Sequence, residues 1–180
     1  NLPGAKGIVG PWVHKYPHFA VPEPRIGFLQ EALRWWDRWL KDLPTGVEED
    51  PAYRPYLMDG VRPARWYAER SGRWLAEPQG GTVEARSTRM TLGDGTLADA
   101  SDASLMTAPQ IIASPQDTGT EAGEYCAIWL GPELPGDQRG DDAGSLCFDS
   151  APMAQTDIVG APVVTLTLAS DVPQAQIAVR

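Results

Sequence analysis

Two histidines, His14 and His18, are the only side chains in this sequence that can exchange protons near neutral pH unaided. Both follow a short apolar run at residues 6–12, which a Gly-Pro pair interrupts. The general base of a Ser-His-Asp hydrolase lies on such a loop, directly after a strand. His14 is therefore the candidate catalytic residue, and from spacing alone an ordinary surface histidine is the alternative.

The order of residues limits what His14 could do within this chain. No G-x-S-x-G nucleophile motif occurs, and no Ser, Asp or Glu precedes His14, since the first acidic residue is Glu23. A triad built on His14 needs a serine and an aspartate upstream of Asn1. We therefore expect the chain to be part of a longer protein and to be inactive by itself.

Tryptophans are the second group of interest. Trp12 comes two residues before His14 and is a candidate for lining a substrate pocket. Trp35, Trp36 and Trp39 recur at helical spacing, which is more typical of core residues than of a stacking platform.

No metal or other cofactor is expected. His14 and His18 are four residues apart, but Pro17 prevents the helix that would place both on one face. The acidic run at residues 137–142 has too few regularly spaced oxygens for a calcium loop. We interpret it as a solvated turn in which Arg139 forms an ion pair with a neighbouring acid.

Composition narrows the class of protein and of partner. The chain has 180 residues, of which 42% are hydrophobic and 22% charged, as in soluble globular proteins. Its formal net charge of −9 argues against nucleic acid and anionic membranes as partners. No membrane-spanning run or signal peptide is visible. Cys126 and Cys147 are expected to be free thiols, with the cytoplasm as the favoured compartment.

Charge divides the chain into two parts. Residues 1–75 hold 11 Lys and Arg against 9 Asp and Glu, a net charge of +2, whereas residues 76–180 hold 4 against 15, a net charge of −11. Six of the seven tryptophans lie in the first part, and a turn-rich run follows at residues 77–81. We place the domain boundary between residues 76 and 77.

The expected elements differ between the parts. Residues 6–12 and 54–58 are predicted strands, and apolar residues at spacings of three and four predict a helix over residues 24–43. The apolar stripe of this helix is wide, so we expect it to be covered on two sides. Short segments between turn signals then predict a mainly β domain. These segments are residues 87–92, 125–130, 145–148, 158–159, 163–168 and 176–179.

Four stretches together resemble the cocaine-esterase and X-prolyl dipeptidyl-peptidase family of serine hydrolases. Residues 6–14, which end in GPWVH, resemble the family's catalytic-histidine segment, and residues 33–41 (LRWWDRWLK) resemble the helix that follows it. Residues 138–150 (QRGDDAGSLCFDS) and 157–163 (DIVGAPV) resemble the opening of its jelly-roll core.

The resemblance implies that residues 1–76 are the C-terminal part of an α/β-hydrolase domain. It likewise implies that residues 77–180 are a truncated jelly-roll β-sandwich of the galactose-binding-like kind. The full-length enzyme would cleave a small-molecule ester, an amide or a peptide through a Ser-Asp-His triad, with His14 as its histidine. The alternative function is a non-catalytic jelly-roll module that binds carbohydrate or calcium.

Overall fold

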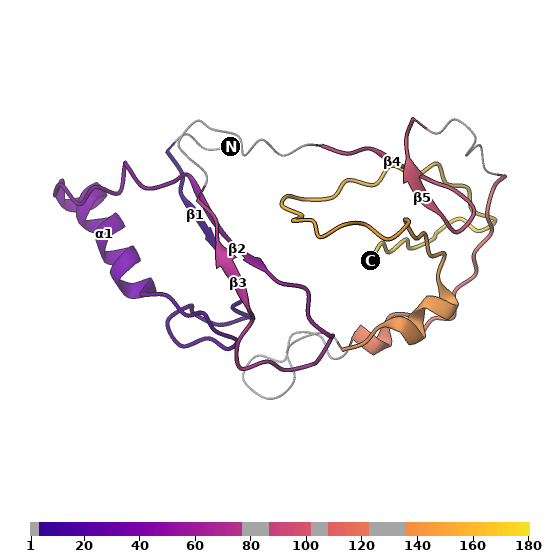
Figure 1. Ribbon diagram of the computed structural model, residues 1–180, viewed down its shortest axis with the longest axis horizontal. Coiled ribbons are helices and arrows are strands. Elements are labelled where there is room, and N and C mark those ends of the chain that lie inside the picture. Colours follow the sequence, from indigo (N-terminus) through magenta and orange to yellow (C-terminus); the bar gives the residue numbers. More distant parts are fainter. Residues whose placement is uncertain (1–3, 77–86, 102–107, 123–135) are drawn as a thin grey trace.

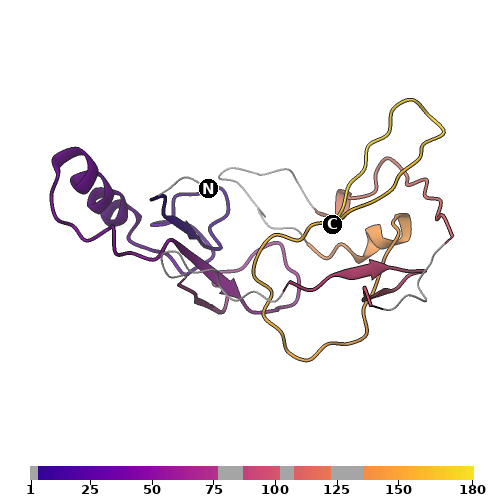
Figure 2. The ribbon, with the colours of Figure 1, turned by 90° about the horizontal axis from the view of Figure 1, so that it is seen from above.

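The computed structural model describes residues 4–76, 87–101, 108–122 and 136–180. The elements in chain order are β1 (Gly7–Val9), α1 (Phe28–Lys41), β2 (Tyr53–Met58), β3 (Gly72–Trp74), β4 (Met90–Leu92) and β5 (Leu97–Asp99), then the 3₁₀ helices η1 (Thr120–Ala122) and η2 (Arg139–Gly144). Helix α1 and strands β1–β3 lie toward one end of the molecule, and the β4–β5 hairpin lies toward the other (Figures 1 and 2).

Strands β1, β2 and β3 form one sheet in that order, which confirms the two strands predicted in the first part. β1 pairs in parallel with β2, in a register that sets Gly7 opposite Tyr53. β3 pairs antiparallel with β2. Parallel neighbours need a long crossover connection, and here the connection carries α1.

Helix α1 confirms the helix predicted from the apolar spacing, with shorter ends. Residues 24–27 are not helical, and the Ile26 N–H donates to the Pro17 carbonyl instead. The helix ends at Asp42, whose φ of 56° is left-handed and whose N–H returns to the Asp37 carbonyl. Pro44 and Gly46, two residue types that disfavour a helix, follow.

The expectation that α1 is covered on two sides is wrong for the described residues. None of its residues is buried, and Trp36 and Leu40 are 54% and 74% exposed. The sheet beside α1 has only three strands, two of them three residues long, and cannot cover so wide a stripe.

Polar contacts attach α1 to β2 instead. Glu31 of α1 accepts hydrogen bonds from the Arg54 guanidinium of β2 at 3.0 and 3.3 Å. Arg34 reaches the same carboxylate at 3.3 Å and Asp50, in the turn before β2, at 3.1 Å. We call Glu31, Arg34, Asp50 and Arg54 the Glu31 network. Pairing of guanidinium and carboxylate groups gives strong, directional hydrogen bonds.

The second part forms the β4–β5 hairpin, closed by a turn in which the Gly93 N–H donates to the Thr96 carbonyl at 2.7 Å. Asp149 pairs alongside it through a bridge to Thr96. Short sheets with few helices agree with the predicted mainly β character. The proposed boundary between residues 76 and 77 borders undescribed residues and stays a prediction.

Several predicted strands are wrong. The segment at residues 87–92 is a strand only from Met90, and residues 145–148, 158–159, 163–168 and 176–179 are not strands. Alternation predicts a strand only where a neighbouring strand supplies hydrogen bonds, and these segments have none within the described residues. Val163 is accordingly 88% exposed. The segment at residues 125–130 lies outside the described residues.

Replacing Glu31 by alanine should weaken the fold, because Arg34 and Arg54 lose their shared acceptor. We expect the free energy of unfolding to fall by about 1–2 kcal/mol, since the carboxylate is partly exposed. Urea denaturation followed by tryptophan fluorescence measures this change.

Lys41→Ala is the control on the same helix, since the lysine of its ion pair with Asp37 is 62% exposed. It should cost at most about 0.5 kcal/mol. Equal losses in the two variants would contradict the special role of Glu31.

Candidate functional site

The candidate site lies on the loop of residues 10–27, which we call the His14 loop. It leaves the carboxyl end of β1, beside the parallel strand β2. In open α/β sheets, functional loops gather at the carboxyl ends of parallel strands. The loop turns tightly, because the Val13 N–H donates to the Pro11 carbonyl at 3.2 Å and the Lys15 N–H to the Val13 carbonyl at 2.6 Å.

A backbone bridge ties the far side of the His14 loop to the segment before β3. The Glu23 N–H donates to the Ala68 carbonyl at 2.8 Å, and the Arg70 N–H donates to the Glu23 carbonyl at 2.9 Å. Ala20 and Pro22, beside this bridge, are fully buried. The most buried residues described in the first part therefore lie next to the hydrogen bonds that hold the His14 loop.

His14 is exposed within the tight turns of the loop. Among the described residues, its imidazole has no hydrogen-bond or ion-pair partner. Both ring nitrogens are therefore open to a group supplied from elsewhere. A general base needs a nucleophile and an orienting acid within hydrogen-bond reach, and no described residue supplies either to His14.

His18 occupies a different environment from His14. Its ring stacks on Phe28 at 6.0 Å between centroids, with an interplanar angle of 8°, and meets Phe19 edge-on at 4.7 Å. Its Nδ1 is buried and has no hydrogen-bond partner within the described part of the chain. Packing accounts for His18, and the sequence pattern could not distinguish it from His14.

Trp12 is turned toward the sheet. Its Nε1–H donates to the Pro24 carbonyl at 2.6 Å, and its ring lies 5.9 Å from that of Trp74 in β3. Trp74 in turn meets Tyr56 of β2 edge-on at 5.1 Å. The structure thus keeps Trp12 and His14 on one loop but gives Trp12 packing partners of its own.

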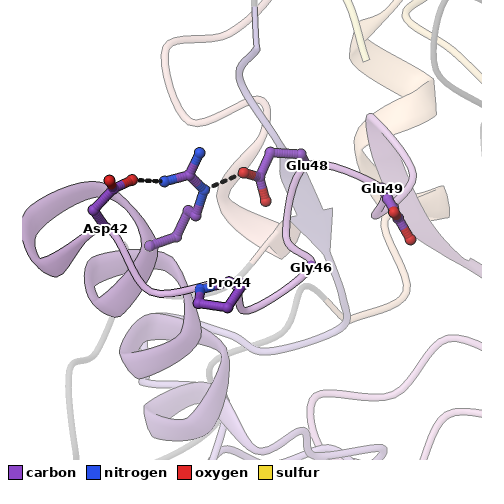
Figure 3. A pocket seen from close by; sticks show the side chains of 6 residues that line it. Asp42, Pro44, Gly46, Glu48 and Glu49 are labelled. Atoms are coloured by element: carbon purple, nitrogen blue, oxygen red, sulfur yellow. Dashed lines mark hydrogen bonds and ion pairs between the residues drawn. The ribbon is translucent and has the colours of Figure 1, made fainter.

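A pocket of about 420 Å³ lies where α1 ends (Figure 3). Its lining residues are Arg38, Asp42, Pro44, Gly46, Glu48 and Glu49. Arg38 donates to both Glu48 and Asp42, whereas Glu49 turns away from this group. The hydrogen bonds raise the pKa of Arg38, and the one from Arg38 lowers the pKa of the Glu48 carboxyl. The described lining contains no serine, cysteine or histidine, and its guanidinium, that of Arg38, is already paired with two carboxylates.

The acidic run at residues 137–142 confirms one prediction and corrects another. Arg139 forms the expected ion pair, with Asp137. Asp141, by contrast, is only 7% exposed, so the prediction of a wholly solvated turn is wrong. Its carboxylate accepts the N–H groups of Gly119 at 2.8 Å and Glu121 at 3.2 Å. These partners lie about twenty residues away, where no local pattern reveals them.

The described ranges contain neither a metal-binding cluster nor a membrane-spanning helix. There, no group of three or more His, Cys, Asp or Glu side chains could hold a metal ion. No helix found in these ranges is long and apolar enough to span a bilayer. Cys147 is an exposed free thiol, and Cys126 lies outside the described residues.

Comparison with known families gives one match. A family model described as the X-Pro dipeptidyl-peptidase C-terminal non-catalytic domain matches residues 45–180. Searches of curated proteins and of solved structures found no significant match. The matched span includes β2 to β5, and His14, Trp12 and α1 precede it. Since β2 pairs with β1, the sheet beneath the His14 loop joins residues on both sides of the start of the match.

The ion pair between Arg139 and Asp137 should be visible in the titration of the Asp137 carboxyl group. The hydrogen bonds from Arg139 lower the pKa of Asp137 from 3.8 to about 2. Any stability from this pair is therefore present above pH 3.8 and is lost as the pH falls through about 2. In Arg139→Gln, the pKa should return toward 3.8, as carboxyl ¹³C NMR titration would show. An unchanged titration would contradict the pairing.

Asp141→Asn tests the buried carboxylate. The amide keeps one acceptor oxygen in place of two, so one of the two backbone N–H groups loses its acceptor and faces an NH2 donor, and neither keeps a charged partner. We expect a loss of about 1–2 kcal/mol in the free energy of unfolding, measured by urea denaturation. The exposed Asp117→Asn is the control and should change stability by less than about 0.5 kcal/mol.

Proposed function

The chain belongs to the X-Pro dipeptidyl-peptidase C-terminal non-catalytic domain family, and from this premise we propose that it is part of a serine hydrolase that cleaves an ester or amide bond. The family points to a hydrolase as the parent protein, and residues 45–180 are its non-catalytic domain. The expectation that these residues do not catalyse by themselves is thereby confirmed. Catalysis falls to residues that precede the domain, and His14 is the one we assign to it.

The exposed imidazole of His14 is the observation that carries this assignment. His14 lies on a loop that follows the parallel strand β1 and is held by backbone hydrogen bonds. Both of its ring nitrogens are free of partners among the described residues. This is the setting that a triad histidine needs, because its nucleophile must approach from another part of the protein. His18, packed among aromatic rings, does not offer it.

In the proposed mechanism, His14 accepts the serine hydroxyl proton as the serine oxygen attacks the carbonyl carbon. His14 then gives this proton to the leaving group when the tetrahedral intermediate collapses to the acyl-enzyme. In a second cycle, His14 takes a proton from water as the water oxygen attacks the acyl carbon. His14 then returns this proton to the serine oxygen as the bond between the acyl group and the serine breaks and the acid leaves. The serine, the aspartate that orients His14 and the oxyanion donors come from outside these 180 residues.

The two parts have separate roles in this proposal. Residues 1–76 supply the last elements of an α/β-hydrolase sheet, with α1 packed on the rest of that sheet; β2 and β3 then belong to this sheet although they lie within the matched span. Residues 77–180 form a jelly roll that shapes the cleft without taking part in the chemistry. The name of the family favours peptides with proline next to the cleaved bond, and acyl esters are the other substrate class.

The test uses the full-length protein with an activated acyl ester and an Xaa-Pro p-nitroanilide. His14→Ala should lower kcat by about a thousandfold or more on whichever substrate is turned over, with unchanged folding.

His18→Phe is the control, because it keeps an aromatic ring in the cluster and removes only the imidazole. It should retain activity within about threefold of the unsubstituted enzyme. Activity that survives His14→Ala would overturn the assignment of His14. Absence of turnover in the unsubstituted protein would favour a carbohydrate- or calcium-binding module.

A further inference from the structure

We propose that Trp12 is a positioning residue that fixes the direction in which the His14 loop presents the His14 imidazole. This inference rests on the proposed function and replaces the expectation that Trp12 lines the substrate pocket. Three contacts of the Trp12 side chain carry it.

The first contact closes the loop. The Trp12 indole N–H can only donate, and it donates to the Pro24 carbonyl at 2.6 Å. This bond joins residues twelve positions apart and is partly buried. A buried donor that loses its acceptor is costly, so the bond holds the two sides of the loop together.

The second contact lies at the start of the loop. A Cβ atom added to Gly10 would lie 2.6 Å from two carbon atoms of the Trp12 ring, Cε2 and Cζ2. Separations this short do not occur between such atoms. The indole therefore packs directly over the Gly10 backbone, and this arrangement requires glycine at position 10.

The third contact, with Trp74, anchors the indole to the sheet. Trp74 in β3 lies 5.9 Å from the Trp12 ring, and Tyr56 in β2 supports Trp74 at 5.1 Å. The Tyr56 hydroxyl is itself fixed by donating to the Arg70 carbonyl at 2.9 Å. The position of Trp12 is thus set by β2 and β3, which are hydrogen-bonded to each other and therefore move together.

The position of Trp12 affects the position of His14, because the two residues are close together in the sequence. One residue, Val13, separates them, and it takes part in both tight turns of the loop. A rotation of Trp12 would therefore displace the imidazole. Misplacing a catalytic group by about 1 Å can reduce the rate about a hundredfold. A residue that acts in this way changes kcat rather than substrate affinity.

The experiment compares Trp12→Phe, Trp12→Ala and Gly10→Ala in the full-length enzyme, using two acyl esters with a small and a bulky acyl group. Trp12→Phe keeps a ring but loses the N–H, and Gly10→Ala leaves Trp12 intact while displacing its ring. We expect kcat to fall about tenfold or more in all three, equally for both esters, with KM within about twofold. Trp66→Phe, at an exposed position between β2 and β3 and away from α1, is the control and should have no effect.

Hydrogen exchange of the peptide that covers the His14 loop gives a readout that does not depend on turnover. Exchange there should be faster in Trp12→Phe and Gly10→Ala and unchanged in Trp66→Phe. If Trp12→Ala raises exchange throughout the protein, it is unfolding, and the other two variants decide.

Three results would overturn the inference. The first is a change in KM that differs between the two esters, which would make Trp12 a substrate-lining residue. The second is unchanged kcat or unchanged loop exchange in Trp12→Phe and Gly10→Ala, while His14→Ala is inactive; this outcome refutes the role of Trp12 alone. The third is full activity in His14→Ala, which refutes the proposed function and the positioning role with it.

Discussion

The carboxylate of Glu31 is the contact on which the arrangement of the first part depends. It joins two guanidinium groups, Arg34 on α1 and Arg54 on β2, and Arg34 extends the connection to Asp50. None of the residues of α1 is buried, so within the described chain the helix is held by polar contacts more than by apolar packing. Since α1 connects two parallel strands, its attachment also fixes where the preceding loop must end.

The His14 loop is consequently fixed at several points. It starts at β1 and ends at α1, a backbone bridge at Glu23 ties it to the segment before β3, and Trp12 connects it to the sheet. An exposed imidazole on a loop held in this way can be both accessible and well directed. Beyond the loop, Arg73 of β3 pairs with Asp157, so a basic first part meets an acidic second part through at least one ion pair.

The spacing of apolar residues predicted β1, β2 and α1, because these elements depend on residues that are close together in the sequence. Features that depend on distant partners were not predictable. The alternating residues 163–168 find no partner strand, and Asp141 is buried by backbone groups about twenty residues away. The same holds for the candidate site. The Gly-Pro pair in the sequence predicted that His14 lies on a loop. The indole contact of Trp12 with Pro24 depends on how that loop folds back.

The central claim is that His14 is the base of a serine nucleophile supplied by another part of the same protein. The most direct measurement is a crystal structure of the full-length protein after reaction with a fluorophosphonate, which marks the nucleophilic serine covalently. The account predicts that Nε2 of His14 lies about 3 Å from the oxygen of the modified serine. A modified serine paired with a different histidine, or the absence of any modified serine, would contradict it.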